Sequence, residues 1–126
     1  MQSDFKKRLT DCGSYIDFLE FYGRDWFDFL PHHKFYTQAS WLAFRQIVAN
    51  TILEKPLTKG EAEAAFKTNG ASLLATAIEQ KIVHEQRKKN IKEVYILASD
   101  ELIVGWLSHI ERTRDELWQK LAGNKL

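Results

Sequence analysis

The sequence predicts a mainly α-helical domain that carries one small β-hairpin. Apolar residues recur at three- and four-residue intervals over most of the chain, which is the period of an amphipathic helix. Between residues 82 and 97 this period changes to alternation, which is typical of paired strands. The chain has 126 residues with only six Gly and two Pro, so we expect residues 1–126 to form a single domain without linkers.

An aromatic helix is expected over residues 14–30, because large rings follow one another at helical spacing and Pro31 then ends the run. Cys12 is interpreted as a small, unreactive residue near the start of this helix, and a redox-sensing thiol is the alternative. A second helix, Gln38 to Ile52, follows a short polar connection. Two interpretations of the aromatic stripe stay open: core packing, or a dimer surface or ligand pocket, since so small a domain has limited interior for many rings. The stripe consists of Tyr15, Phe18, Tyr22, Trp26 and Phe29.

A pair of short helices is predicted next. The first begins at Thr58, which together with Glu61 forms the pattern of a capping box. The stretch from Lys67 to Gly70 breaks the helical run, because Asn and Gly tolerate the positive φ of a sharp turn. Thr68 or Asn69 is a candidate cap for the second helix, which is short and amphipathic from residue 71 onward.

The helix pair leads into a basic hairpin. One strand begins near Ile82, the other returns from Ile91 to Leu97, and the turn between them reads Arg87-Lys88-Lys89-Asn90. Cations on a protruding loop can displace the counterions condensed on nucleic acid; the alternative is a solvated hairpin tip. Ser99 then precedes a C-terminal helix over residues 100–121 with an acidic first turn. This order is the layout of a winged helix-turn-helix with N- and C-terminal dimerisation helices.

Charge is concentrated locally and not spread over the whole chain. The net charge is only +1, so there is no global cationic field to hold nucleic acid. Residues 81–92, however, hold five cations and one anion, whereas residues 1–30 hold four cations and six anions. This asymmetry assigns nucleic-acid binding to the hairpin and a different task to the N-terminal segment.

These elements resemble the winged-helix transcriptional regulators of the multiple-antibiotic-resistance-regulator (MarR) family. The matching text is Ala75-Thr76-Ala77-Ile78-Glu79-Gln80-Lys81-Ile82-Val83, followed by residues 84–97 as the wing. The order of elements is similar over roughly residues 36–121. Three features depart from the family pattern: Lys81 stands where glycine is usual, the wing lacks an Asp-x-Arg pair, and the second helix of the pair has no Lys or Arg between Thr68 and Gln80.

The resemblance implies a dimeric DNA-binding transcriptional regulator whose two recognition helices read a pseudo-palindromic site. We expect double-stranded DNA to be contacted by polar residues of the turn and recognition helix and by the cations of the wing. These are Thr68, Asn69, Ser72, Thr76, Arg87, Lys88, Lys89 and Lys92. The alternative function is a winged-helix module for protein–protein interaction that has no sequence-specific DNA binding.

A homodimer is expected because the C-terminal helix is longer than its own winged unit needs; an intramolecular helical bundle is the alternative. The residues predicted for the dimer interface are Tyr15, Phe18, Tyr22, Trp106, Ile110, Leu117, Trp118 and Leu121. A small apolar effector is a further expectation, enclosed by rings of the N-terminal helix and by Trp41 or Phe44, and the family resemblance implies such a pocket.

An enzyme is not expected. Adjacent His32 and His33 cannot share one face of a regular element, and His84 and His109 lie far from them, so the sequence predicts neither a metal site nor a cofactor. There is no glycine-rich phosphate loop, and no neighbouring base activates Cys12. A single cysteine, the lack of an apolar leader and the absence of any long apolar run favour a soluble protein of the cytoplasm that does not enter a membrane.

Overall fold

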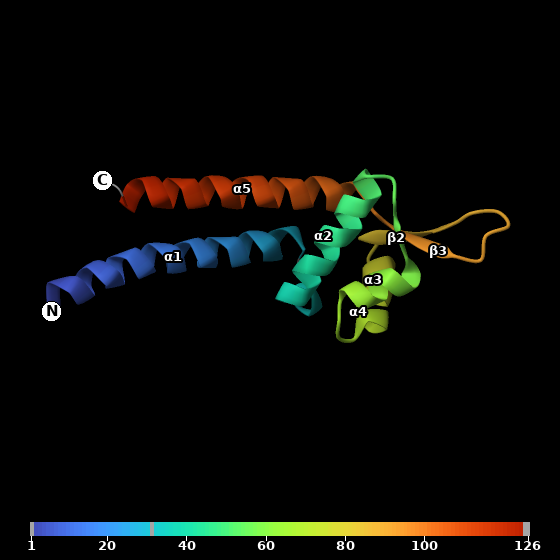
Figure 1. Ribbon diagram of the computed structural model, residues 1–126, viewed down its shortest axis with the longest axis horizontal. Helices are drawn as coiled ribbons and strands as arrows, with labels where there is room; N and C mark the ends of the chain where they lie inside the picture. The colour runs from blue at the N-terminus through green and yellow to red at the C-terminus, as the bar shows by residue number, and fades with distance from the viewer. Residues whose placement is uncertain (1, 31, 125–126) are drawn as a thin grey trace. The chain divides into compact units, whose positions relative to one another are not determined.

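The computed structural model describes residues 2–30 and 32–124, which form two compact units. Unit 1 contains the described residues up to 30 and from 107 to 124, and unit 2 contains residues 32–106. The chain is mainly helical, with a small antiparallel sheet in unit 2 (Figure 1). The coarse prediction of a helical chain with one small hairpin is therefore confirmed. The expectation of a single domain over residues 1–126 stays a prediction.

Unit 1 consists of α1 (Gln2–Phe29) and the later part of α5 (Asp100–Asn124). The predicted start of the aromatic helix at residue 14 was wrong, since α1 begins twelve residues earlier. The hydroxyls of Thr10 and Ser14 donate to the carbonyls four residues before them, at 3.1 and 3.4 Å, so these polar residues fit within the helix. Cys12, which was expected near a helix start, lies inside α1 and is exposed.

The helices of unit 2 begin with a short 3-10 helix, η1 (His33–Phe35), and continue with α2 (Gln38–Ile52), whose bounds are those predicted. The N-terminus of α2 is capped by Thr37 Oγ1, which accepts from the Ser40 N–H at 3.1 Å. After it come α3 (Lys59–Ala65) and α4 (Gly70–Glu79). Three fully buried rings join η1, α2 and the end of α3 by edge contacts with centroids 5.1 and 5.5 Å apart: Phe35, Phe44 and Phe66.

The sheet contains β1 (Leu57–Thr58), β2 (Val83–Arg87) and β3 (Val94–Ala98) in the order β1-β3-β2, with both pairings antiparallel. In the register, Ile96 of the central strand lies between Leu57 and Glu85 and is fully buried. The sheet is joined to α2 because the Ala98 N–H donates to Thr51 Oγ1 at 3.0 Å.

Two features of the sheet differ from the sequence prediction. β1 was not predicted, since two residues are too few to show an alternating pattern. β3 begins at Val94, three residues after the predicted Ile91, because the preceding residues form the loop. In that loop Asn90 has a φ of 67°, and the Ile91 N–H donates to the Lys88 carbonyl at 3.2 Å.

α5 begins after Ser99, as predicted, and Ser99 Oγ accepts from the Leu102 N–H at 3.0 Å. Asp100 and Glu101 lie in its first turn, where carboxylates interact favourably with the positive end of the helix dipole. The helix ends at Asn124, three residues beyond the predicted end.

Candidate nucleic-acid interface

The candidate interface begins with the helix pair α3 and α4, whose first element is fixed by the predicted capping box. Thr58 Oγ1 accepts from the Glu61 N–H at 3.2 Å, while Glu61 Oε1 accepts from the Thr58 N–H at 3.0 Å. These hydrogen bonds lower the pKa of the Glu61 carboxyl. The start of α3 is therefore determined by Thr58 and Glu61, which are close neighbours in the sequence, so the sequence alone could locate it.

The turn between α3 and α4 is sharp because two of its residues have left-handed backbones and a third has no side chain. Lys67 and Asn69 have φ values of 66° and 56°, and for Asn69 this is the conformation predicted. Gly70 is needed for space and not for its φ: a Cβ there would lie 1.9 Å from the carbonyl oxygen of Glu63 and 2.7 Å from its carbonyl carbon. The N-terminus of α4 thus approaches the backbone of α3 closely.

The predicted side-chain cap of the second helix was wrong. Asn69 occupies the N-cap position of α4, but its side chain makes no capping hydrogen bond. A capping side chain needs an extended backbone at that residue, whereas Asn69 is left-handed. Its amide is instead exposed at the tip of the turn, beside the exposed Thr68.

The outer face of α4 has small, uncharged side chains in its first two turns and ends at one exposed carboxylate, Glu79. Leu74 and Ala77 are buried toward the body of unit 2, whereas Ala71, Ser72 and Ala75 are exposed. Thr76 is half-buried, and its hydroxyl donates to the Ser72 carbonyl at 3.1 Å. With side chains this short, the helix backbone can come close to whatever surface meets this face.

The loop between β2 and β3 is rich in cations, and in Figure 1 it extends away from the helices of unit 2. Arg87 is the last residue of β2, and three lysines lie in the loop that follows. All four side chains are exposed: Arg87, Lys88, Lys89 and Lys92.

Only part of this positive charge is compensated. Glu85 Oε2 lies 3.7 Å from Arg87 Nη2 and 3.8 Å from Lys59 Nζ, so one carboxylate is shared between two cations. Lys88 Nζ lies 5.5 Å from the centre of the Tyr95 ring, which positions the side chain without neutralising it. Within the part of the chain that the structure describes, the three lysines of the loop form no ion pair.

The residues predicted to contact DNA therefore form two groups in unit 2, one at the turn and outer face of α4 and one on the β2–β3 loop. The structure adds one contributor that the sequence did not single out, Glu85, and gives Gly70 a role other than the positive φ expected of it. Gly70 allows the close approach of α4 to α3, and Glu85 binds one wing cation. Glu85 could have been suspected, because it lies two residues from Arg87 on the same face of a strand.

The residues predicted for a dimer interface differ widely in exposure. Three of them are exposed, as residues of a dimer interface should be in a single copy of the chain. The exposed fractions are 58% for Tyr15, 63% for Trp118 and 43% for Leu121. Trp106 is buried in unit 2, where its ring centre lies 5.3 Å from that of Trp41. The other four are half-buried in unit 1: Phe18, Tyr22, Ile110 and Leu117.

The rings predicted to enclose an effector are used in packing instead. Phe44 is fully buried in the core of unit 2, and Trp41 packs on Trp106, so the effector stays a prediction. Unit 2 does have an open groove of about 290 Å³ between α2 and the end of α3. Its lining is mixed in character: Leu42, Arg45, Gln46, Ala49, Asn50, Ala65 and Lys67.

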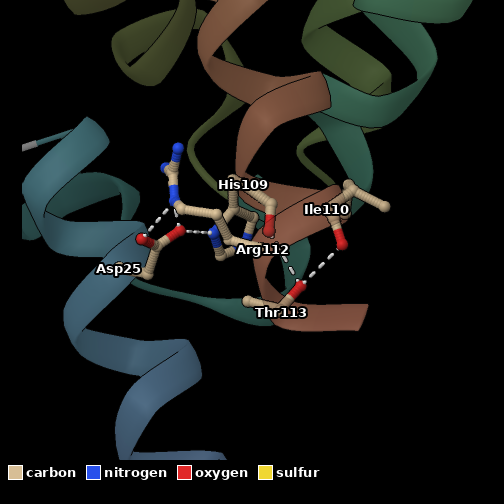
Figure 2. A network of polar contacts seen from close by, with 5 residues as sticks. All are labelled: Asp25, His109, Ile110, Arg112 and Thr113. Carbon is tan, nitrogen blue, oxygen red and sulfur yellow. Dashed lines mark hydrogen bonds and ion pairs between the residues drawn. The ribbon is translucent and has the colours of Figure 1, made fainter. Parts of the chain in front are cut away.

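Unit 1 contains a polar network that the sequence analysis missed (Figure 2). Asp25 of α1 accepts from His109 Nδ1–H at 2.7 Å and from Arg112 of α5 at 2.8 and 3.1 Å. Thr113 is buried beside them and donates to the His109 carbonyl at 2.9 Å. The signal in the sequence was weak, because Asp25 and His109 are 84 positions apart.

The network is a neutral imidazole held by an ionised carboxylate. Burial lowers the pKa of His109 and outweighs the opposing effect of Asp25, so the ring is neutral at pH 7. Burial would raise the pKa of Asp25, but hydrogen bonds from Arg112 and His109 hold it below its ordinary value. Rings of Tyr22, Trp26 and Phe29 surround the imidazole, with centres 4.8 to 5.9 Å away. This arrangement fixes α1 to α5.

Comparison with known proteins found no matching family model, no matching curated protein and no matching solved structure. Among the described residues, no three His, Cys, Asp or Glu side chains are grouped so that they could hold a metal ion. Within the same residues, no helix combines the length and the apolar character that crossing a membrane requires.

Proposed function

We propose that the protein is a dimeric winged helix-turn-helix regulator that binds double-stranded DNA. The order of elements in unit 2 supports this proposal, since two helices meet at a sharp turn and are followed by a two-stranded hairpin. The short strand β1 pairs with the far strand of that hairpin, which closes the sheet against the helices. In this fold α4 is the recognition helix and the β2–β3 loop is the wing.

The conformation of Lys81 gives separate support to the resemblance with MarR regulators. Lys81 follows α4 and has a φ of 62°, in the left-handed region that favours glycine. The resembled family usually has glycine at this position. The backbone conformation that would account for the family's glycine is therefore found here, although the residue itself differs.

The observation that carries the proposal is the loop with Arg87, Lys88, Lys89 and Lys92. Most of their charge is uncompensated, since Arg87 shares Glu85 with Lys59 and, among the described residues, the three lysines pair with no carboxylate. Exposed, uncompensated cations are suited to phosphate, because binding releases the counterions condensed on DNA. We assign these side chains to the backbone beside the site, where they would position the protein without reading sequence.

Base reading is assigned to α4. Its exposed residues Ala71, Ser72 and Ala75 let the helix enter a major groove closely, where a serine hydroxyl can bind base edges and an alanine methyl can contact thymine. Asn69, free of a capping role, adds an amide that can form two hydrogen bonds with adenine. Sequence preference should therefore be modest and biased toward A·T pairs.

The test compares three proteins by fluorescence anisotropy on one random-sequence duplex. One is unaltered, one has Arg87, Lys88 and Lys89 replaced by alanine, and one has Lys7→Ala, Arg24→Ala and Arg114→Ala in unit 1. The last two lose the same charge. We expect the wing variant to bind at least about tenfold more weakly and the unit 1 variant to bind like the unaltered protein.

Equal losses in the two variants would mean that net charge alone attracts the DNA, and the wing would have no special role. If the unaltered protein fails to bind DNA at low salt, the regulator is excluded. The outer face of α4, which has no Lys or Arg and ends at the exposed Glu79, would then favour the protein–protein interaction module.

A further inference from the structure

A row of exposed apolar residues follows the first five turns of α1. Phe5, Leu9, Ile16 and Leu19 are 55, 73, 59 and 46% exposed, and Cys12 between them is also exposed. Their successive spacings are four, three, four and three residues. This is the seven-residue repeat that places one stripe of side chains against a second helix in a coiled coil. We call these five residues the α1 seam.

The α1 seam is distinct from the face of α1 that contacts α5. Asp25 and Tyr22 face His109, and Phe18 continues that face with its ring 6.5 Å from Tyr22. At 3.6 residues per turn, the seam lies about a third of a turn away around the helix. The α5 contact therefore leaves the seam uncovered.

The charges beside the seam indicate which helix would cover it. Lys6 and Arg8 form a basic cluster beside Phe5 and Leu9, whereas Glu20 makes the other end of the seam acidic beside Leu19. In a parallel pair of copies the two basic clusters would lie at the same height. In an antiparallel pair each basic cluster would lie beside the acidic end of its partner.

The seam is also nearly symmetric in sequence about its middle residue. Phe5 and Leu19 are each seven residues from Cys12. Reversing the helix direction therefore maps Phe5 onto Leu19, and it brings Leu9 and Ile16, which are three and four residues from Cys12, to within one position of each other, close to what a twofold axis across the helix requires. Lys6 and Glu20 occupy equivalent positions beside the α1 seam. In an antiparallel pair, Lys6 of one copy therefore lies close to Glu20 of the second copy.

We propose that the α1 seam binds the α1 seam of a second copy of this chain in an antiparallel pair. This inference rests on the dimer of the proposed function and specifies a face of α1 other than Tyr15, Phe18 and Tyr22. Each dimer then contains two Lys6–Glu20 pairs across the axis. Exposed ion pairs are individually weak, but reversing one partner turns two attractions into two repulsions in the same dimer.

The experiment measures the dimer dissociation constant by light scattering and sedimentation. Lys6→Glu alone and Glu20→Lys alone should each raise it about tenfold. The double variant should restore it, because each pair is again opposite in charge. Ile16→Asp should abolish the dimer, and Val104→Asp, which changes another exposed apolar residue outside α1, should leave it intact. Circular dichroism checks that each variant is folded.

Each result separates one part of the inference from another. If the unaltered protein is monomeric, both the seam interface and the dimer of the proposed function are excluded, whether or not the protein binds DNA. If Ile16→Asp leaves the dimer dissociation constant unchanged, the dimer exists but the α1 seam is not its interface. Single reversals without effect, combined with loss of the dimer in Ile16→Asp, would exclude the antiparallel arrangement.

Discussion

Replacing Gly70 with alanine should destabilise the protein, although alanine is the better helix former. The added Cβ would lie 1.9 Å from the Glu63 carbonyl oxygen, more than 1 Å closer than any real contact. That oxygen belongs to the backbone of α3, so no side-chain rotation removes the overlap. The N-terminus of α4 must move away from α3.

The size of the effect follows from two opposing contributions. Helix propensity favours alanine over glycine by at most about 1 kcal/mol. Overpacking costs roughly 1 to 3 kcal/mol, and an overlap of this size with rigid backbone belongs at the upper end of that range. We therefore expect Gly70→Ala to lower the free energy of unfolding by about 2 kcal/mol, which shifts the urea midpoint by about 1 M.

Gly60 provides the matched control, because it also lies in the first turn of a helix but no atom lies within 4 Å of its Cβ position. Gly60→Ala should be neutral or stabilise the protein by up to about 1 kcal/mol. Urea unfolding followed by far-UV circular dichroism measures both variants. If Gly70→Ala is as stable as the unaltered protein, the close contact of α4 with α3 is not present in solution and the reasoning is refuted.

Three further predictions concern stability. Thr58→Ala should lower the free energy of unfolding by about 1 kcal/mol through loss of the capping box, and an unchanged thermal midpoint would contradict this. Lys81→Gly should raise the free energy of unfolding by about 1 kcal/mol, because the left-handed φ of 62° strains a residue that has a Cβ. A lower free energy of unfolding in urea would contradict the inference that Lys81 is strained. Stability should fall as the pH drops from 7 to 5, since the pKa of His109 is lower in the folded than in the unfolded protein, where it is near the ordinary 6.5. His109→Asn keeps a hydrogen-bond donor for Asp25 and should make stability depend less on pH in this range. If the pH dependence is the same in the variant, groups other than His109 cause it.

The parts of the fold that the sequence predicted well depend on neighbouring residues. The start of α3 at Thr58, the start of α5 after Ser99 and the start of α2 after Thr37 are set by side chains within one turn of the helix end. Local spacing also located the sharp turn before α4. These signals can be read without knowing what the rest of the chain does.

The parts that were missed depend on residues far apart in the sequence or on backbone angles. Nothing near Trp106 indicates that it packs on Trp41 in the core of unit 2 and does not face solvent. The contact of Asp25 with His109 joins two helices from opposite ends of the chain. β1 exists only because β3 pairs with it, so its two residues carry no signal of their own.

The candidate interface was predictable in its charges but not in its geometry. The sequence places Arg87, Lys88 and Lys89 in one turn, and the structure shows that a single carboxylate, Glu85, compensates only the first of them. The role of Gly70 was attributed to a positive φ, whereas it is the approach to Glu63 that excludes a side chain.

The salt dependence of binding to duplex DNA tests the central claim most directly. The affinity of the unaltered protein should fall steeply and linearly on a double-logarithmic plot against salt concentration. Replacing Arg87, Lys88 and Lys89 by alanine should reduce that slope by about 5 in a dimer, which loses six phosphate contacts. A slope that stays the same in the variant, or no binding at low salt, would contradict the assignment of the β2–β3 loop as a DNA-binding wing.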